Sequence, residues 1–163
     1  MKITSQEEYG LRLLIRIAGC KDQQGMSIPQ LSEAEGLSSH YVAKLTRVLR
    51  MGGFINSTPG YKGGYVLAMP ADKIVINKVL KTLGGSLFDK DFCETHSGKL
   101  NICTNSVECS SRSLWQMIQF IVDRFLDQVT LADLSNSEKK SGNVFEELLD
   151  HSNKTFRPKD IVS

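Results

Sequence analysis

The chain has 163 residues, of which 40% are hydrophobic and 23% are charged, a balance that excludes a disordered or fibrous protein. This length suits one ordinary domain with an appended element and is short for two independent cores. The formal net charge of +2 is too small to indicate nucleic-acid binding by itself. No stretch approaches the roughly 18 apolar residues of a membrane span, and the first residues lack the layout of a signal peptide, so we expect a cytoplasmic protein.

In the first predicted helix, apolar side chains over residues 9–18 form a broad stripe that can be buried. Arg12 and Arg16 lie four residues apart on the other side of this helix. Thr4 or Ser5 can cap its start. We therefore expect a helix that packs through its apolar stripe and keeps both arginines on the opposite face.

A helix-turn-helix is predicted next. Ser27 precedes Pro29 by two residues and can cap a short second helix that ends at Gly36. Residues 41–51 follow, with apolar positions spaced for one helical face. Two helices joined by a Gly-containing turn allow the second one to enter a major groove of DNA.

The second of these helices carries polar and basic side chains outside its apolar stripe, and these can hydrogen-bond base edges and phosphates. Its N-terminal backbone N–H groups also suit a phosphate oxygen. Helix-turn-helix packing occurs as well in proteins that bind no nucleic acid, where a basic helix is a solvated face. The expected DNA-binding residues on and before this helix are Ser38, Ser39, His40, Tyr41, Lys44, Arg47 and Arg50.

A β-hairpin is predicted directly after this helix, with strands over 54–57 and 65–68 and a tip rich in Pro and Gly. Gly60, Tyr61 and Lys62 lie at the tip, where we expect them to reach an adjacent groove or phosphate. Two helices followed by a hairpin form a winged helix-turn-helix. This order favours DNA binding, because three consistent elements rarely arise by chance.

Three cysteines define the next segment. A short helix over 70–83 ends at two glycines, and the helical periodicity is lost from 88 to 112. Cys93, Cys103 and Cys109 lie in this polar stretch, with nine and then five residues between them. Because a reducing cytoplasm keeps thiols free, we expect metal binding or redox chemistry rather than structural disulfides.

The residues alone leave several kinds of cysteine site open. The spacing matches no zinc finger with paired Cys-x-x-Cys ends, but His96 can complete a tetrahedral zinc site, which makes zinc the alternative metal. An iron–sulfur cluster suits the same thiols equally. The loop cysteines can also form a thiol–disulfide switch or stay unligated, whereas Cys20 lies alone near the end of the first helix and favours a packing role.

A long helix is predicted over 114–131, and its wide apolar stripe needs a partner surface. The simplest partner is a second copy across a two-fold axis, and the alternative is the chain's own N-terminal domain. From Ser135 the chain is polar, with a weak helix near 144–149, so we expect a mobile tail. The expected domains are a DNA-binding domain over 1–83, a cysteine-rich sensor loop over 84–112, a dimerisation helix over 113–134 and the tail over 135–163.

No enzyme is predicted. Ser/His/Asp and Cys/His groups at catalytic spacing are absent, and residues 60–64 lie in a hairpin instead of a strand-to-helix phosphate loop. The main rival to a DNA-binding regulator is a protein-interaction module, in which the winged helix binds a partner protein and the cysteines hold zinc structurally.

Several motifs together point to a known family. They are Met1-Lys2-Ile3-Thr4-Ser5 with Tyr9-Gly10-Leu11, Leu45 to Gly53 with Leu49-Arg50, Gly60 with Gly63-Gly64-Tyr65, the three loop cysteines, and Leu114-Trp115 followed by Thr130 to Leu134. With them the chain resembles the Rrf-two type transcription regulators from residue 1 to about 134. The resemblance implies a mainly α fold, a winged helix-turn-helix with a small β-hairpin wing and a long C-terminal dimerisation helix.

The resemblance also implies a function. A homodimer would bind a double-stranded DNA operator and sense iron–sulfur status, redox state or nitric oxide through a 2Fe–2S or 4Fe–4S cluster on the three loop cysteines. The iron–sulfur assembly regulators of the family place a His three residues after the last cysteine, where this chain has Arg112. Its nitric oxide sensors take a carboxylate from the first helix of the other subunit, where this chain has Glu8, with His96 as the rival ligand.

Two departures from the family pattern accompany this resemblance. The first gap between the loop cysteines is longer than in the iron–sulfur assembly regulators or nitric oxide sensors, which leaves the cluster type open. The family often has an Arg before Gly60, and Pro59 stands there in this chain. A minor-groove Arg contact is therefore missing, which implies a different operator.

Overall fold

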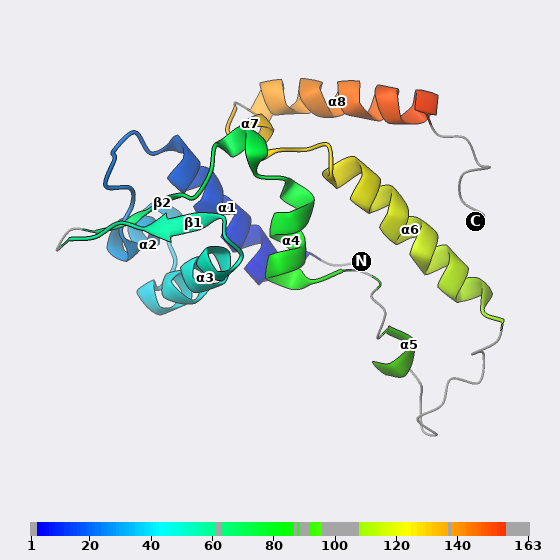
Figure 1. Cartoon of the computed structure of the whole chain (residues 1–163), viewed down its shortest axis with the longest axis horizontal. Coiled ribbons are helices and arrows are strands. Elements are labelled where there is room, and N and C mark those ends of the chain that lie inside the picture. The colour runs from blue at the N-terminus through cyan, green and yellow to red at the C-terminus, as the bar shows by residue number, and fades with distance from the viewer. Residues whose placement is uncertain are drawn as a thin grey trace.

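The computed structural model describes residues 3–60, 63–86, 88, 92–95, 108–136 and 138–155. Tyr61, Lys62, His96 and Cys103, which the sequence predicts as functional residues, lie outside this described part. Within it the chain is mainly helical with a small two-stranded antiparallel sheet (Figure 1), which confirms the predicted fold class.

Helix α1 covers Ser5–Gly19 and has Thr4, one of the two cap residues that the sequence offers, as its N-cap within a capping box. The Thr4 hydroxyl accepts the Glu7 N–H, and the Glu7 carboxylate accepts the Thr4 N–H at 2.8 Å. The inward face of the helix buries an apolar stripe that includes Leu13. The start of α1 is therefore fixed locally and its position is fixed by packing.

Helices α2 (Ile28–Glu35) and α3 (Ser39–Met51) form the predicted helix-turn-helix. Ser27 caps α2, and Gly36 ends it with a φ of 65°, a left-handed conformation that glycine adopts without steric penalty. Ser38 caps α3 by accepting a backbone N–H with its hydroxyl. The turn between the helices thus has defined stop and start signals.

The wing consists of strands β1 (Ile55–Ser57) and β2 (Tyr65–Leu67), which pair antiparallel. A further bridge joins the wing to the segment before α2. The Met26 N–H donates to the Tyr65 carbonyl at 3.1 Å, and the Tyr65 N–H donates back at 2.9 Å. The base of the wing is therefore fastened to the helix-turn-helix.

The single helix predicted over 70–83 is wrong at its start. The structure contains a 3-10 turn, Ala71–Lys73, and a separate helix α4, Ile76–Gly84. Between them Val75 is paired as an isolated bridge with Thr130, from much later in the chain. This tertiary pairing holds the backbone extended where the local sequence alone favours a helix.

The C-terminal half contains α5 (Phe92–Thr95), α6 (Ser110–Leu126) and α7 (Leu131–Leu134). The helix predicted over 114–131 therefore ends five residues too late, because the structure has a turn between the end of α6 and the start of α7. The reason is Val129, which is 2% exposed and returns with the start of α7 into the core of the winged helix.

Helix α8 covers Glu138–Thr155, a longer span than the weak helix predicted near 144–149. Ser141 is buried in it, and the ring of Phe145 meets that of Phe125 at 6.3 Å between centroids. Figure 1 shows α8 running above the end of α6 that is joined to α7. The C-terminal segment thus adds a packed helix to the molecule.

The hydrophobic core lies among α1 to α4 and the wing, and α7 completes it. Figure 1 shows these elements as one body from which α6 extends toward α5. No residue of α6 is buried. Fully buried side chains of the core include Leu13, Leu14, Leu31, Val42, Leu45, Leu49, Ile55, Val79 and Leu131.

Candidate nucleic-acid interface and cysteine site

Helix α3 separates its apolar and polar sides. Val42, Leu45 and Leu49 are buried, and the buried hydroxyl of Thr46 donates to the Val42 carbonyl at 3.0 Å, so it leaves no unpaired polar group. Six of the predicted DNA-binding residues on and before α3 are exposed. They are Ser38, Ser39, His40, Lys44, Arg47 and Arg50.

Tyr41 differs from the other residues predicted to contact DNA on this helix. Its side chain is half-buried, and its ring meets the ring of Tyr9 edge-on, with centroids 6.1 Å apart and planes at 86°. Tyr9 belongs to α1, so this contact joins α1 to the first turn of α3. The ring of Tyr41 therefore packs helix against helix.

The described part of the wing has an ordered base. The Thr58 hydroxyl donates to the Gln24 carbonyl at 2.8 Å and accepts the Gly64 N–H at 2.7 Å. Gly60 is exposed, with a φ of 115° that favours glycine. The predicted contacts Tyr61 and Lys62 lie between these points, outside the described residues.

Cys109 is the N-cap of α6. Its sulfur lies 3.1 Å from the Ser111 hydroxyl oxygen and accepts the Arg112 backbone N–H at 3.4 Å. The hydrogen bond with Ser111, followed by that with the Arg112 N–H, lowers the pKa of the Cys109 thiol. A lowered pKa favours the thiolate, which is the nucleophilic and metal-binding form of cysteine.

Cys93 lies in α5 and is half-buried. It lines a hollow of about 760 Å³ together with Phe88, Arg112 and Gln119. The rings of Phe88 and Phe92 pack at 5.0 Å between centroids beside it. The described start of the cysteine loop therefore packs near the side of α6.

The other predicted ligands are not brought together in the described structure. Glu8 is exposed on α1, and Cys103 and His96 lie outside the described residues. Among the residues that the structure does describe, no three His, Cys, Asp or Glu side chains form a group able to hold a metal ion. Cys20 is half-buried at the end of α1, with its sulfur 3.9 Å from the Asp22 carbonyl oxygen.

A chain of polar contacts, which the sequence did not predict, joins the cysteine loop to α4. The Phe88 N–H donates to Gln119 Oε1 at 3.1 Å, and Gln119 Nε2 donates to Asp123 Oδ1 at 2.7 Å. Lys81 Nζ of α4 then donates to Asp123 Oδ2 at 2.8 Å. Gln119 and Asp123 lie four residues apart, one helical turn, on a largely apolar helix. Two polar residues at this spacing are a sequence signal that could have indicated the contact.

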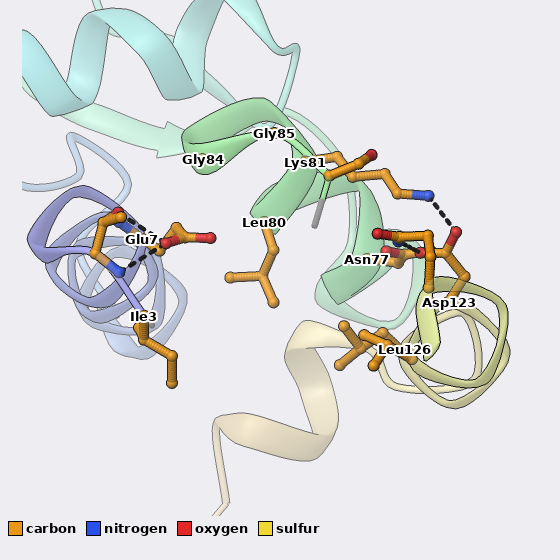
Figure 2. A pocket seen from close by; sticks show the side chains of 13 residues that line it. Ile3, Glu7, Asn77, Leu80, Lys81, Gly84, Gly85, Asp123 and Leu126 are labelled. Atoms are coloured by element: carbon orange, nitrogen blue, oxygen red, sulfur yellow. Dashed lines mark hydrogen bonds and ion pairs between the residues drawn. The ribbon is translucent and has the colours of Figure 1, made fainter. Parts of the chain in front are cut away.

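These contacts border a cavity of about 580 Å³ between the N-terminal segment, α4 and α6. Figure 2 shows Asn77, Lys81 and Asp123 on one side of it, with Glu7 and Ile3 opposite and Leu80 between them. Asn77 Nδ2 donates to Asp127 Oδ1 at 2.8 Å. The polar groups between α4 and α6 are thus paired with each other across the cavity wall.

Several large apolar side chains of α6 are exposed. Leu114 is 52% exposed, Ile121 46% and Trp115 45%, and Met117 and Phe120 are exposed as well. These side chains leave apolar area of α6 in contact with water in the single chain. In the described part of the chain, no helix has the length and apolar character needed to cross a membrane.

Comparison with known proteins places these features in a family. The model of the Rrf2 family, described as iron-dependent transcriptional regulators, matches residues 3–137. Protein rrf2 of Nitratidesulfovibrio vulgaris is 35% identical over 134 residues, which are 82% of this chain and 87% of that protein. The HTH-type transcriptional regulator IscR of Erwinia tasmaniensis is 28% identical over 139 residues, 85% of this chain and 81% of that protein.

A third relative is known both as a sequence and as a structure. The HTH-type transcriptional regulator CymR of Bacillus subtilis is 30% identical over 136 residues, covering 83% of this chain and 91% of that protein. Its solved structure, that of a global cysteine regulator, matches with a TM-score of 0.64 over 83% of this chain and 96% of that chain. The predicted winged-helix regulator without enzymatic activity is thereby confirmed. The chain belongs to the Rrf2 family of transcriptional regulators, the family that its motifs resemble.

Proposed function

We propose that this regulator is a homodimer that reads a double-stranded DNA operator with α3 and the wing of each subunit. The observation that carries this proposal is the division of α3 into a buried apolar side and an exposed side with Lys44, Arg47 and Arg50. Two such helices related by a two-fold axis would reach successive major grooves of a partly palindromic site about one helical turn apart. The exposed apolar surface of α6 supports the dimer, because association would remove it from water.

The experiment compares Lys44→Ala and Arg47→Ala with the wild-type chain on a duplex selected from a random-sequence library by the wild-type protein. Each variant should weaken binding and reduce the slope of log K against log salt by about 1, because each loses a phosphate or base contact. Lys140→Ala, an exposed lysine on α8, is the matched control and should leave the affinity unchanged. Unchanged affinity in both α3 variants would exclude this helix as the reading helix.

We further propose that Cys93, Cys103 and Cys109 hold an iron–sulfur cluster, with Glu8 of the partner subunit as the fourth ligand. The chemistry of the two described donors, Cys93 and Cys109, fits a cluster, because both are free thiols. The pKa of Cys109 is lowered, which favours the thiolate form that binds a metal. When bound, the cluster would supply sensitivity to iron–sulfur status, oxidants or nitric oxide. The chain's own contribution is to hold Cys109 at the start of α6 and to favour the thiolate through the hydrogen bonds that lower its pKa.

Anaerobic purification followed by absorption spectroscopy and by iron, sulfide and zinc analysis tests the cluster. We expect a coloured protein with iron and acid-labile sulfide, and Glu8→Ala should lower the iron content while Glu33→Ala, an exposed acid on α2, should not. A colourless protein with one zinc per chain would overturn the cluster in favour of a zinc-stabilised winged helix, with His96 as the fourth ligand.

A thiol-based redox regulator is the second candidate, and the lowered pKa of Cys109 favours it specifically. A thiolate reacts with oxidants in the absence of any metal. The same metal analysis separates the two functions, because the thiol regulator would bind operator DNA as a metal-free protein and lose that binding on treatment with peroxide.

A further inference from the structure

The most enclosed acidic side chain among the ion pairs of the described structure is Glu35, the last residue of α2. Its side chain is 2% exposed, and two arginines of α1 bind its two oxygens. Arg12 donates from Nη2 and Nε to Oε2 at 2.6 and 2.7 Å, and Arg16 donates from Nε to Oε1 at 2.5 Å. The sequence places these arginines on the outer side of the first helix, where the structure also has them exposed, and from there they reach across to α2.

A buried carboxylate constrains its partners strongly. Removing a charge from water is unfavourable unless the charge is paired and hydrogen-bonded, and Glu35 has a guanidinium on each oxygen. If Arg12 or Arg16 turned outward to a DNA phosphate, one oxygen of Glu35 would be left buried without its partner. The two guanidiniums are therefore held by Glu35, even though their side chains are 45% and 53% exposed.

The clamp formed by Arg12, Arg16 and Glu35 continues to the reading helix. The guanidinium carbon of Arg12 lies 5.6 Å from the centroid of the Tyr9 ring, and that ring meets Tyr41 of α3 edge-on. One line of contacts thus runs from the end of α2, through α1, to the first turn of α3. These contacts join the same three helices as the apolar core, but they lie at the surface of the helices and not between their buried faces.

We propose that Glu35 is a positioning residue for DNA binding: together with Arg12 and Arg16 it fixes the angle of α3 against α1 and α2. Neither arginine contacts a phosphate. This inference rests on the proposed use of α3 as the reading helix. It assigns a structural role to two exposed arginines near the DNA-binding element.

The test uses the full-length protein and the duplex selected from a random library. Glu35→Gln should raise the Kd about tenfold, the size of a coupling between neighbouring groups, and leave the slope of log K against log salt as in the wild type. Arg12→Gln should behave in the same way. Lys44→Ala is the contrast, because loss of a DNA contact should reduce that slope by about 1.

A second variant separates positioning from stability. Glu35→Gln leaves two arginines without their carboxylate and should lower the Tm. Arg12→Gln, Arg16→Gln and Glu35→Gln combined remove all three charges, so most of the Tm should return while the Kd stays about tenfold raised. Recovery of the Kd together with the Tm would overturn the positioning role.

The remaining outcomes identify which proposal fails. Wild-type affinity in Glu35→Gln, or a reduced salt slope in Arg12→Gln, would overturn the clamp while leaving the reading helix intact. Wild-type affinity and salt slope in Lys44→Ala and Arg47→Ala would overturn the reading helix itself, whatever the effect of Glu35→Gln.

Discussion

At the scale of single residues, Cys109 has the most specific chemical environment in the described part of the cysteine loop. Its folded pKa lies below that of an ordinary thiol because Ser111 and the Arg112 N–H stabilise the thiolate. The thiolate therefore persists as the pH falls below the ordinary thiol pKa, and it is lost only when the pH falls through the folded pKa.

We predict that Cys109 of the metal-free protein, with the other three cysteines replaced by Ser, reacts with iodoacetamide along a pH curve shifted below that of free cysteine. Ser111→Ala should move this curve back toward higher pH, because it removes the largest stabilising hydrogen bond. Ser113→Ala, an exposed serine one half-turn further along α6, is the control. Identical curves for Ser111→Ala and its parent would contradict the assigned cause.

Two glycines with positive φ offer a second test at this scale. A Cβ on Gly25 (φ 74°) would lie 2.1 Å from the Tyr65 carbonyl oxygen, whereas a Cβ on Gly36 (φ 65°) would meet nothing within 4 Å. Gly36→Ala should lower the free energy of unfolding by about 1 kcal/mol through backbone strain alone. Gly25→Ala should lower it by about 3 kcal/mol, because it also breaks the bridge to the wing.

Urea unfolding of both variants measures this difference. The two substitutions share the backbone penalty, so the excess at Gly25 reports the contact between the wing and the segment before α2. Equal losses would mean that the wing can move away from Gly25 without penalty, and would contradict the fastening of its base.

At the scale of elements, the sequence predicts what local chemistry determines. Ser27 and Gly36 bound α2 in the structure as their cap preferences indicate, and Ser38 begins α3 in the same way. The sequence fails where distant segments decide. The extended residue Val75 and the end of α6 both depend on pairing with residues near Thr130, which no local pattern contains.

The contact through Gln119 gives a prediction about the link between the cysteine loop and α4. Gln119→Met keeps the length of the side chain but removes both hydrogen bonds, to the Phe88 N–H and to Asp123. If these contacts carry the state of the loop to the DNA-binding domain, the ratio of operator Kd values between metal-free and metal-loaded protein should shrink about fivefold.

The control for this experiment is Gln128→Met, beyond the end of α6, whose amide donates to the Arg124 carbonyl at 2.8 Å. It should keep the wild-type ratio. A wild-type ratio in Gln119→Met as well would show that the loop influences DNA binding by another route, and fluorescence anisotropy on the selected duplex measures both ratios.

At the scale of the whole molecule, the unpartnered face of α6 predicts the assembly. Leu114→Glu with Ile121→Glu, two positions seven residues apart on one helical face, places two charges on that face and should raise the dimer dissociation constant at least about a hundredfold, because each charge would have to be buried. Sedimentation equilibrium should then find the 18.1 kDa chain in place of the dimer at micromolar concentration. Lys140→Glu on α8 is the control, and a dimer in the double variant would move the interface elsewhere.

The candidate site shows the same limit of prediction as the fold. The exposed bases of α3 follow from helical periodicity, so the sequence identifies them directly. Arg12 and Arg16 follow the same periodicity, which assigns them to an outer face without revealing that they hold Glu35 from α2. Their partner lies about twenty residues away, and only the fold brings it close.

The return of Val129 and Leu131 into the core has a consequence for the architecture of the protein. These residues are 2% and 0% exposed, and Leu131 N–H donates to the Ile74 carbonyl at 2.9 Å. The DNA-binding fold is therefore discontinuous in sequence, and the segment between residues 86 and 129 is an insertion within it rather than an appendage. A fragment cut before the insertion would therefore lose part of its own core, because Val129 and Leu131 belong to that core.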